Sequence, residues 1–323
     1  MRIPRSLLVS DSNPQVFHVI SRVVDKRFIF QDKEKAFFLS LIRSFESYSG
    51  LQVLSYCLMG NHFHLLLHVP AKPKNISKDE IRRRMTFIYS QKKIAEFDAL
   101  IQQMKDNGLD HFEEEFYQKQ RARMYDLSSY VKELKERFTK WYNKRTDRSG
   151  TLWESRFKSL LVAGEEGALM NVAAYIELNS VRAGLADEPQ DYRWCSYTEA
   201  VAGGQKARAG ITRIVGTLES NTSWENTASS YRRYFIHKGA SQNDRRKGFS
   251  EEKANQEIRN VGHLGEVSIL KTKMRYFTDG VVIGSQRFIE DFVKSHKAIV
   301  GENRKSLGTE IKGCGIFSLR NVK

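Results

Sequence analysis

Two histidines, His62 and His64, are the first residues in this chain whose type and spacing could do chemistry. They follow the turn-forming pair Gly60-Asn61 within an apolar segment, 56–69, which we expect to form two strands joined by a tight turn. Because side chains alternate between the two faces of a strand, both imidazoles would lie on one face and could supply half of a metal site. A histidine in an apolar strand is, however, more often a buried structural residue, and we interpret His68 in that way or as a support for the site.

The residues that could complete such a site lie in a later segment. A helix over 166–182, ending at Gly184, would place Tyr175 and Asn179 four residues apart and therefore on one face. The amide oxygen of Asn179 and the two imidazoles would hold Mg²⁺ or Mn²⁺ and leave positions for phosphate oxygens. Tyr175 would lie beside the same phosphate and could attack it, but its ordinary pKa of about 10 requires a nearby cation. Taken alone, a tyrosine in such a helix is more often a packing residue.

A basic and aromatic segment lies between these two groups. We expect residues 151–162 to form a strand, with basic side chains on one face and aromatic side chains mainly on the other. Such interleaving suits contact with phosphates and stacking on bases, although an ordinary strand with a solvated basic face is the alternative. In the preceding helix, 127–144, Tyr142 is a rival nucleophile, which we rank lower because no amide follows it four residues on. The candidate DNA-binding residues are Trp153, Arg156, Lys158 and Arg182.

The composition favours a polyanionic partner. The 323 residues carry a formal net charge of +15, with a pI near 9.6. No run approaches the ~18 apolar residues of a membrane span, and the start lacks a signal-peptide core, so we expect nucleic acid rather than a membrane. Three dispersed cysteines, Cys57, Cys195 and Cys314, argue against a disulfide framework or a thiolate zinc site. We therefore expect a cytoplasmic, nucleoid-associated protein.

The order of the predicted elements indicates the fold class. A strand over 16–24, a helix over 33–49 and the histidine hairpin open an α+β fold with helices on one face of an antiparallel sheet. The charge-dense segment 71–123 is interpreted as a solvated insertion with two helices that break near Asn107-Gly108.

A shift in composition after residue 202 predicts a domain boundary. The run 203–210 is typical of a linker, and residues 203–323 are expected to form a mostly helical, DNA-binding accessory region. Within it we expect an exposed basic stretch at 241–247, a helix over 224–236, and a small helical unit from 258–273, 280–284 and 288–296.

Three motifs, taken together, resemble those of the REP-associated tyrosine transposases, a family of the single-tyrosine HUH (His, hydrophobic, His) superfamily. They lie at 58–67, 150–159 and 175–184, and the resemblance extends over residues 13–200. It implies a ferredoxin-like (RRM-like) catalytic domain, here residues 1–202. It also implies a divalent metal on His62 and His64, with Asn179 at the third ligand position and Tyr175 at the nucleophile. Family members cleave single-stranded DNA in hairpin-forming repeats such as repetitive extragenic palindromes, form a 5′-phosphotyrosine link and release a 3′-OH.

Two positions depart from the family pattern. Ser180 and Gly60 stand where proline is usual, and neither change removes a ligand or the nucleophile. The segment 278–285 resembles one found in longer relatives, which favours an accessory domain over a random fusion.

The leading functional hypothesis is a metal-dependent transposase that cleaves single-stranded DNA. The main alternative is a domesticated protein that binds structured nucleic acid without productive cleavage. An RNA-binding regulator and a nuclease without a covalent intermediate are further alternatives, and a homodimer is an option for its assembly.

Overall fold

The computed structural model describes residues 12–165, 167–216, 223–239, 274–300, 308–311 and 314–320. Its centre is a βαββαβ unit whose strands pair antiparallel in the order β2-β3-β1-β4. This is the ferredoxin-like arrangement, so the predicted α+β class is confirmed. The elements of the unit are β1 (Gln15–Arg22), α1 (Asp32–Ser49), β2 (Gln52–Leu58), β3 (His62–Val69), α5 (Leu127–Arg145) and β4 (Lys158–Val162).

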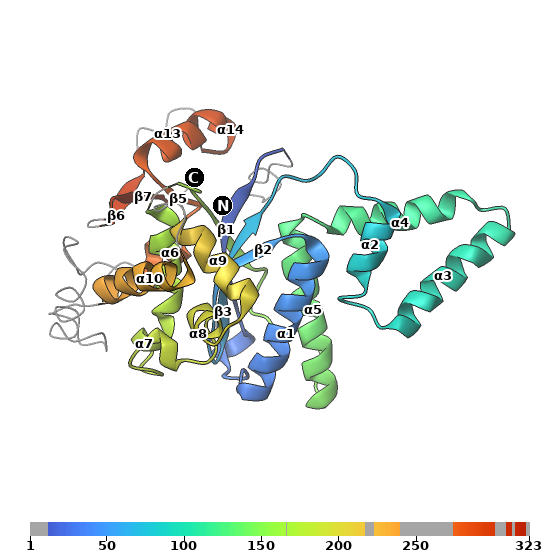
Figure 1. The fold of residues 1–323 in the computed structure, drawn as a ribbon, viewed down its shortest axis with the longest axis horizontal. Helices are drawn as coiled ribbons and strands as arrows, with labels where there is room; N and C mark the ends of the chain where they lie inside the picture. The colour runs from blue at the N-terminus through green and yellow to red at the C-terminus, as the bar shows by residue number, and fades with distance from the viewer. Residues whose placement is uncertain are drawn as a thin grey trace.

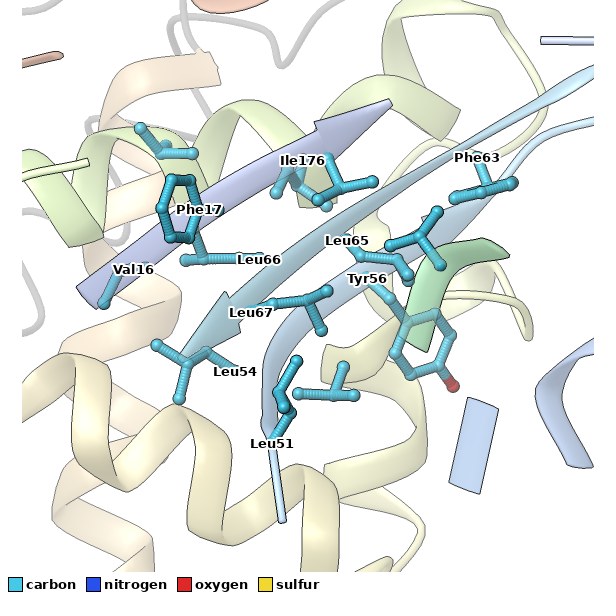
Figure 2. Packing of buried hydrophobic residues seen from close by; sticks show 14 of the residues in the cluster. Val16, Phe17, Leu51, Leu54, Tyr56, Phe63, Leu65, Leu66, Leu67 and Ile176 are labelled. Atoms are coloured by element: carbon cyan, nitrogen blue, oxygen red, sulfur yellow. The ribbon is translucent and has the colours of Figure 1, made fainter. Parts of the chain in front are cut away.

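The register between β1 and β3 divides the side chains into two sets. Ile20 lies opposite His64 and Arg22 opposite His62, so these four share one face, which we call the histidine face. The other face, which we call the apolar face, is formed by large buried side chains. These include Phe17, Val19, Phe63, Leu65 and Leu67. Figure 2 shows several of these side chains extending from neighbouring strands.

Helices α1 and α5 cover the apolar face, as predicted. Phe38 of α1 packs against Phe63 with ring centroids 4.9 Å apart, and Phe138 of α5 packs against Phe38 at 5.0 Å. The Tyr130 hydroxyl of α5 also donates a hydrogen bond to the Ile42 carbonyl of α1. The apolar stripe of α5 thus buries itself against α1 and the sheet.

The histidine face is covered as well, which corrects the prediction of helices on one face only. Helices α6 (Ala168–Glu177), α9 (Gln205–Val215) and α10 (Trp224–Gly239) lie on this side, opposite α1 and α5 (Figure 1). Buried Glu177 of α6 links this layer to the sheet, because its carboxylate accepts hydrogen bonds from Ser55 of β2, Tyr231 of α10 and Ser196. The prediction failed because the second layer of helices comes from parts of the chain outside the βαββαβ unit.

The insertion 71–123 is helical and charge-dense, and it extends away from the sheet beyond α5 (Figure 1). It contains three helices where two were predicted. The break near Gly108 was predicted, and this residue has a positive φ of 76°. The second break, before Ser90, was missed; the Ser90 side chain accepts a hydrogen bond from the Lys93 amide and so starts a new helix. The helices are α2 (Lys78–Met85), α3 (Gln91–Asp106) and α4 (His111–Arg123).

The described part of the C-terminal region is mostly helical, as predicted, and it also contributes three strands that extend the sheet of the βαββαβ unit. Among the described residues, seven strands form one sheet in the order β2-β3-β1-β4-β5-β7-β6. Strand β5 (Val282–Gly284) pairs parallel to β4, so the segment 280–284 is not part of a helical unit as predicted. The remaining strands are β6 (Thr309–Ile311) and β7 (Ile316–Leu319).

Short helices accompany these three strands. Helix α13 begins at Gln286, close to the predicted 288–296, whereas the predicted helix at 258–273 and the basic stretch at 241–247 lie outside the described residues. The helices not yet placed are α7 (Asn179–Arg182), α8 (Ser196–Val201), α12 (Met274–Thr278), α13 (Gln286–Ser295) and α14 (Lys297–Val300).

The predicted linker at 203–210 is wrong, because most of it forms the first turns of α9. This helix packs directly on β2, and Gly210 makes the approach close enough. A Cβ at Gly210 would lie 2.6 Å from the Val53 carbonyl oxygen and 2.7 Å from that of Leu54. The glycine therefore serves close packing rather than flexibility, and the chain continues across residue 202 without a break in packing.

Two smaller expectations concern cysteines and membrane spans. None of the three cysteines forms a disulfide bond, and Cys57 and Cys195 are buried. Among the described residues, none of the helices is both long and apolar enough to cross a membrane.

Candidate active site

A cavity of about 610 Å³ opens on the histidine face, near the start of β3 and the end of β1. It brings together seven of the eight residues singled out from the sequence. Those seven are His62, His64, Arg156, Lys158, Tyr175, Asn179 and Arg182.

The two histidines lie on one face because of the pleat. Their ring centroids are 5.2 Å apart, and His64 is almost completely buried. His62 Nδ1 lies 2.6 Å from the side-chain oxygen of Asn61, which accepts the Nδ1 proton and leaves a lone pair on Nε2. His64 Nδ1 is also occupied, because it lies 3.0 Å from Nε2 of another histidine, His18. Burial lowers the pKa of His62 to about 4 and that of His64 well below its usual value, so both rings are neutral at pH 7.

Tyr175 reaches the histidines from α6. Its ring centroid lies 5.7 Å from that of His64, and it is 2% exposed. Phe277 of α12 stacks on the tyrosine ring at 4.8 Å, and the guanidinium of Arg182 lies over the ring, 4.5 Å from its centroid. Burial raises the pKa of the Tyr175 phenol, while the positive charge of Arg182 acts in the opposite direction. The phenol is therefore protonated at neutral pH.

Asn179 is the first residue of α7, one residue beyond Leu178 at the end of α6, and lies one helical turn beyond Tyr175. Its amide nitrogen donates to the carbonyl oxygens of Tyr175, at 2.9 Å, and Ile176, at 3.2 Å. Because both partners can only accept, the atom that faces them must be the NH₂ group. These bonds leave the side-chain oxygen of Asn179 for another partner.

These donors fit a divalent metal ion. Nε2 of His62, Nε2 of His64 and the Asn179 oxygen form a mixed nitrogen and oxygen set with no charged ligand, which Mg²⁺ or Mn²⁺ would share with phosphate oxygens. Among the described residues, no cluster of three His, Cys, Asp or Glu side chains offers an alternative site. The choice of Mg²⁺ or Mn²⁺ for this donor set stays a sequence-based prediction.

Basic side chains surround the cavity. Arg156 and Lys158 are exposed and line it, as does Arg22 of β1, which the sequence analysis missed. Lys158 Nζ forms an ion pair with Asp279, at 2.9 Å, which follows α12. Arg22 shares the parity of His18 and Ile20 on its strand, but that signal points to the site only once the register with β3 is known.

Trp153 is the predicted DNA-binding residue that lies outside this cavity. The predicted strand over 151–162 is too long, because regular strand structure begins only at Lys158. Trp153 forms one isolated β-bridge, to Val23, and the chain bends after it. Trp153 packs against Phe63 at 5.6 Å, and its indole nitrogen donates to the Thr139 hydroxyl at 2.9 Å. Its ring is therefore mainly part of the core instead of an open platform for bases.

A second cavity, of about 850 Å³, lies between α5 and the segment that contains Trp153. Lys132 and Lys140 line it, and it shares Ser155 and Arg156 with the first cavity. The two hollows are thus adjacent and both basic.

The two residues considered as rivals lie elsewhere. Tyr142 stacks on Phe138 in the layer of α5 and does not line the cavity of the histidines. His68 lies on the same strand face as His64 but pairs with Arg213 of α9 at 2.9 Å, which agrees with a structural role.

Comparisons with known proteins find similarity over part of the chain. Residues 12–119 match the family model described as "Transposase IS200 like". This segment includes both histidines but ends before Tyr175 and Asn179. A solved structure of a REP-associated tyrosine transposase bound to a REP hairpin aligns with a TM-score of 0.35 and 10% sequence identity, over 59% of this chain and 81% of that one. No curated protein matches the chain.

Proposed function

Since residues 12–119 match the family model of the IS200-like transposases, we propose that this protein is a metal-dependent transposase-type endonuclease that cleaves single-stranded DNA. We propose hairpin-forming repeat DNA as its substrate, as the motif resemblance implies, and the cytoplasm, at the nucleoid, as its place of action. The observation that supports this most is the convergence of His62, His64, Tyr175 and Asn179 on one cavity. These side chains come from two segments more than 100 residues apart, and a role in packing alone does not require a shared cavity.

In the proposed reaction, the phenol oxygen of Tyr175 forms a bond to the scissile phosphorus while the bond from phosphorus to the 3′ oxygen breaks. The phenol gives up its proton, and the departing 3′ oxygen takes one up, which leaves a 3′-OH. The DNA remains joined to Tyr175 through its 5′-phosphate. A divalent ion on His62, His64 and Asn179 would act as a Lewis acid toward the phosphate oxygens.

The residues around Tyr175 prepare it for this step. Phe277 stacks on its ring and limits the orientations available to the phenol. Arg182 lies over the same ring and also donates a hydrogen bond to the Tyr175 carbonyl, so its charge is held beside the phenol. A fixed positive charge stabilises the phenolate as it forms.

The basic residues supply a path for the DNA. Arg22, Arg156 and Lys158 line the first cavity, and Lys132 and Lys140 line the second. Because Arg156 lines both, a strand whose scissile phosphate lies in the first cavity would continue into the second. Most of these contacts would be to phosphates and therefore independent of sequence.

A covalent-trapping experiment tests this proposal and is our first prediction. The full chain is incubated with Mn²⁺ and a 3′-labelled single-stranded hairpin DNA, and a denaturant-stable adduct is sought on a gel. We expect an adduct with wild type, none with Tyr175→Phe, and an unchanged yield with the control Tyr142→Phe. Tight binding without an adduct would overturn the catalytic proposal and support the alternative of a binding protein. An adduct that survives Tyr175→Phe would refute the assignment of the nucleophile.

A further inference from the structure

A third histidine, His18, lies directly behind His64 and belongs to none of the three motifs. It is on β1, two residues before Ile20, which is opposite His64, and its side chain is completely buried. The two imidazoles stack with centroids 5.2 Å apart and planes 24° apart. His18 makes two hydrogen bonds, one to His64 Nδ1 at 3.0 Å and one to the carbonyl oxygen of Phe277 at 2.9 Å.

The Phe277 carbonyl determines how the protons are arranged in this chain of groups. A carbonyl oxygen can only accept, so His18 must carry a proton on the Nδ1 atom that faces it. Both hydrogen-bond partners of His18 are uncharged, and a fully buried cation between them would be costly, so its ring is neutral and Nε2 has a lone pair. That lone pair must accept from His64, which places the His64 proton on Nδ1. The lone pair of His64 is then on Nε2, the nitrogen available to the cavity.

We propose that His18 is a positioning residue that holds His64 in the tautomer and ring orientation needed for metal binding through Nε2. The inference rests on the metal site of the proposed function. His62 has a corresponding support in Asn61, whose oxygen accepts the Nδ1 proton. The two histidines would thus present Nε2 for the same physical reason, a hydrogen-bond acceptor behind Nδ1, as is usual for metal-binding histidines.

This assignment gives the C-terminal region a direct part in the site. Phe277 holds His18 through its backbone carbonyl and stacks on Tyr175 through its ring. One residue of α12 therefore supports both the metal ligand and the nucleophile.

The test measures Mn²⁺ affinity of the full chain by isothermal titration calorimetry. In His18→Phe a ring of similar size removes the acceptor, and we expect Mn²⁺ binding to weaken about 10- to 100-fold. In His18→Gln the amide oxygen can accept from His64 Nδ1, and we expect most of the affinity to return. The matched control is His68→Phe, which removes another buried histidine of the same face and should change the affinity less than about twofold. Unchanged affinity in His18→Phe would overturn the inference.

A spectroscopic measurement covers the case in which a variant does not fold. Long-range ¹H–¹⁵N correlation of the metal-free wild type should show His64 protonated on Nδ1 and not on Nε2; the opposite tautomer would refute the inference.

Failure of the proposed function can be told apart from failure of this inference. If wild type binds Mn²⁺ and His64→Ala does not, but wild type forms no DNA adduct, the cleavage proposal is refuted while the role of His18 stands. If His64→Ala binds Mn²⁺ as well as wild type, the metal site fails, and the role of His18 in presenting it fails too.

Discussion

At the scale of single residues, Asn179 combines two roles in one amide group. Its NH₂ group donates to the carbonyls of Tyr175 and Ile176, where α6 ends, and its oxygen is left for the cavity. The same hydrogen bonds that satisfy the end of the helix therefore orient the predicted metal ligand.

Asn179→Asp separates these roles. The carboxylate would face two carbonyl oxygens that can only accept, so we expect a loss of about 1–3 kcal/mol in the free energy of unfolding without metal. Mn²⁺ should raise the unfolding temperature of this variant more than that of wild type, because a charged oxygen binds the ion more strongly. Thermal unfolding with and without Mn²⁺ measures both effects. Asn179→Leu, which lacks a side-chain oxygen, is the control, and Mn²⁺ should raise its unfolding temperature less than that of wild type. An equal rise in unfolding temperature in both variants would contradict the ligand role.

At the scale of secondary-structure elements, α9 and β2 are in unusually close contact. Because a Cβ at Gly210 would lie 2.6 Å from the Val53 carbonyl oxygen, Gly210→Ala must push the helix away from the strand. Alanine favours helix by roughly 1 kcal/mol, yet we expect a net destabilisation of about 1–3 kcal/mol from overpacking. Chemical denaturation checks this. The control Gly164→Ala, where a Cβ meets nothing within 4 Å, should be nearly neutral, and a stabilised Gly210→Ala would show that the contact is not tight.

A second contact between elements depends on pH. His68 of β3 pairs with Arg213 of α9, and burial together with that positive charge lowers the pKa of His68 to about 4. The unfolded chain therefore takes up a proton near pH 6.5 that the folded protein cannot hold, and stability is lost as the pH falls from about 6.5 toward 4. His68→Gln keeps an acceptor for Arg213 but does not titrate. We expect wild type to lose about 1 kcal/mol more than this variant between pH 7 and pH 4.5 in urea denaturation; parallel pH profiles would be inconsistent with the shift.

At the scale of the whole molecule, the chain carries a net charge of +15, and several of its basic side chains line the two cavities. If these residues bind phosphates, the affinity for single-stranded DNA must fall steeply with salt, with a slope that reports the number of contacts. We expect Arg156→Ala to reduce the slope of log K against log salt by about 0.7, one contact on a single strand. Fluorescence anisotropy over a salt series measures this. Lys119→Ala, an exposed charge on α4 away from the cavities, should leave the slope unchanged; equal changes in both would mean diffuse attraction instead of a defined path.

The C-terminal region also forms one sheet with the N-terminal part, which the sequence did not suggest. Strands β5, β6 and β7 extend the sheet of the βαββαβ unit, and Phe277 brings the C-terminal region to the site. The domain boundary was inferred from a shift in composition after residue 202, but composition does not report which segments pair. Three short strands, each of three or four residues, carry too little periodicity to be recognised in advance.

What the sequence determined by itself was local pattern and chemistry. Alternation along a strand places His62 and His64 together, and helical spacing places Tyr175 and Asn179 one turn apart. These rules depend only on neighbouring residues, and the motif resemblance added the expectation that the two segments meet on a ferredoxin-like sheet. Seven of the eight candidate residues line one cavity in the structure.

Only the tertiary structure decided what lies between and behind these residues. The register of β1 against β3 brings His18 and Arg22 beside the hairpin, the fold turns Trp153 into the core, and α12 places a carbonyl against His18. The physical reason is that hydrogen bonds and ring contacts depend on distances of a few ångströms between segments remote in the chain, which spacing along the sequence does not encode. The proposed nucleophile and ligands could therefore be singled out from spacing and motif resemblance, whereas His18, the residue proposed to position His64, could not.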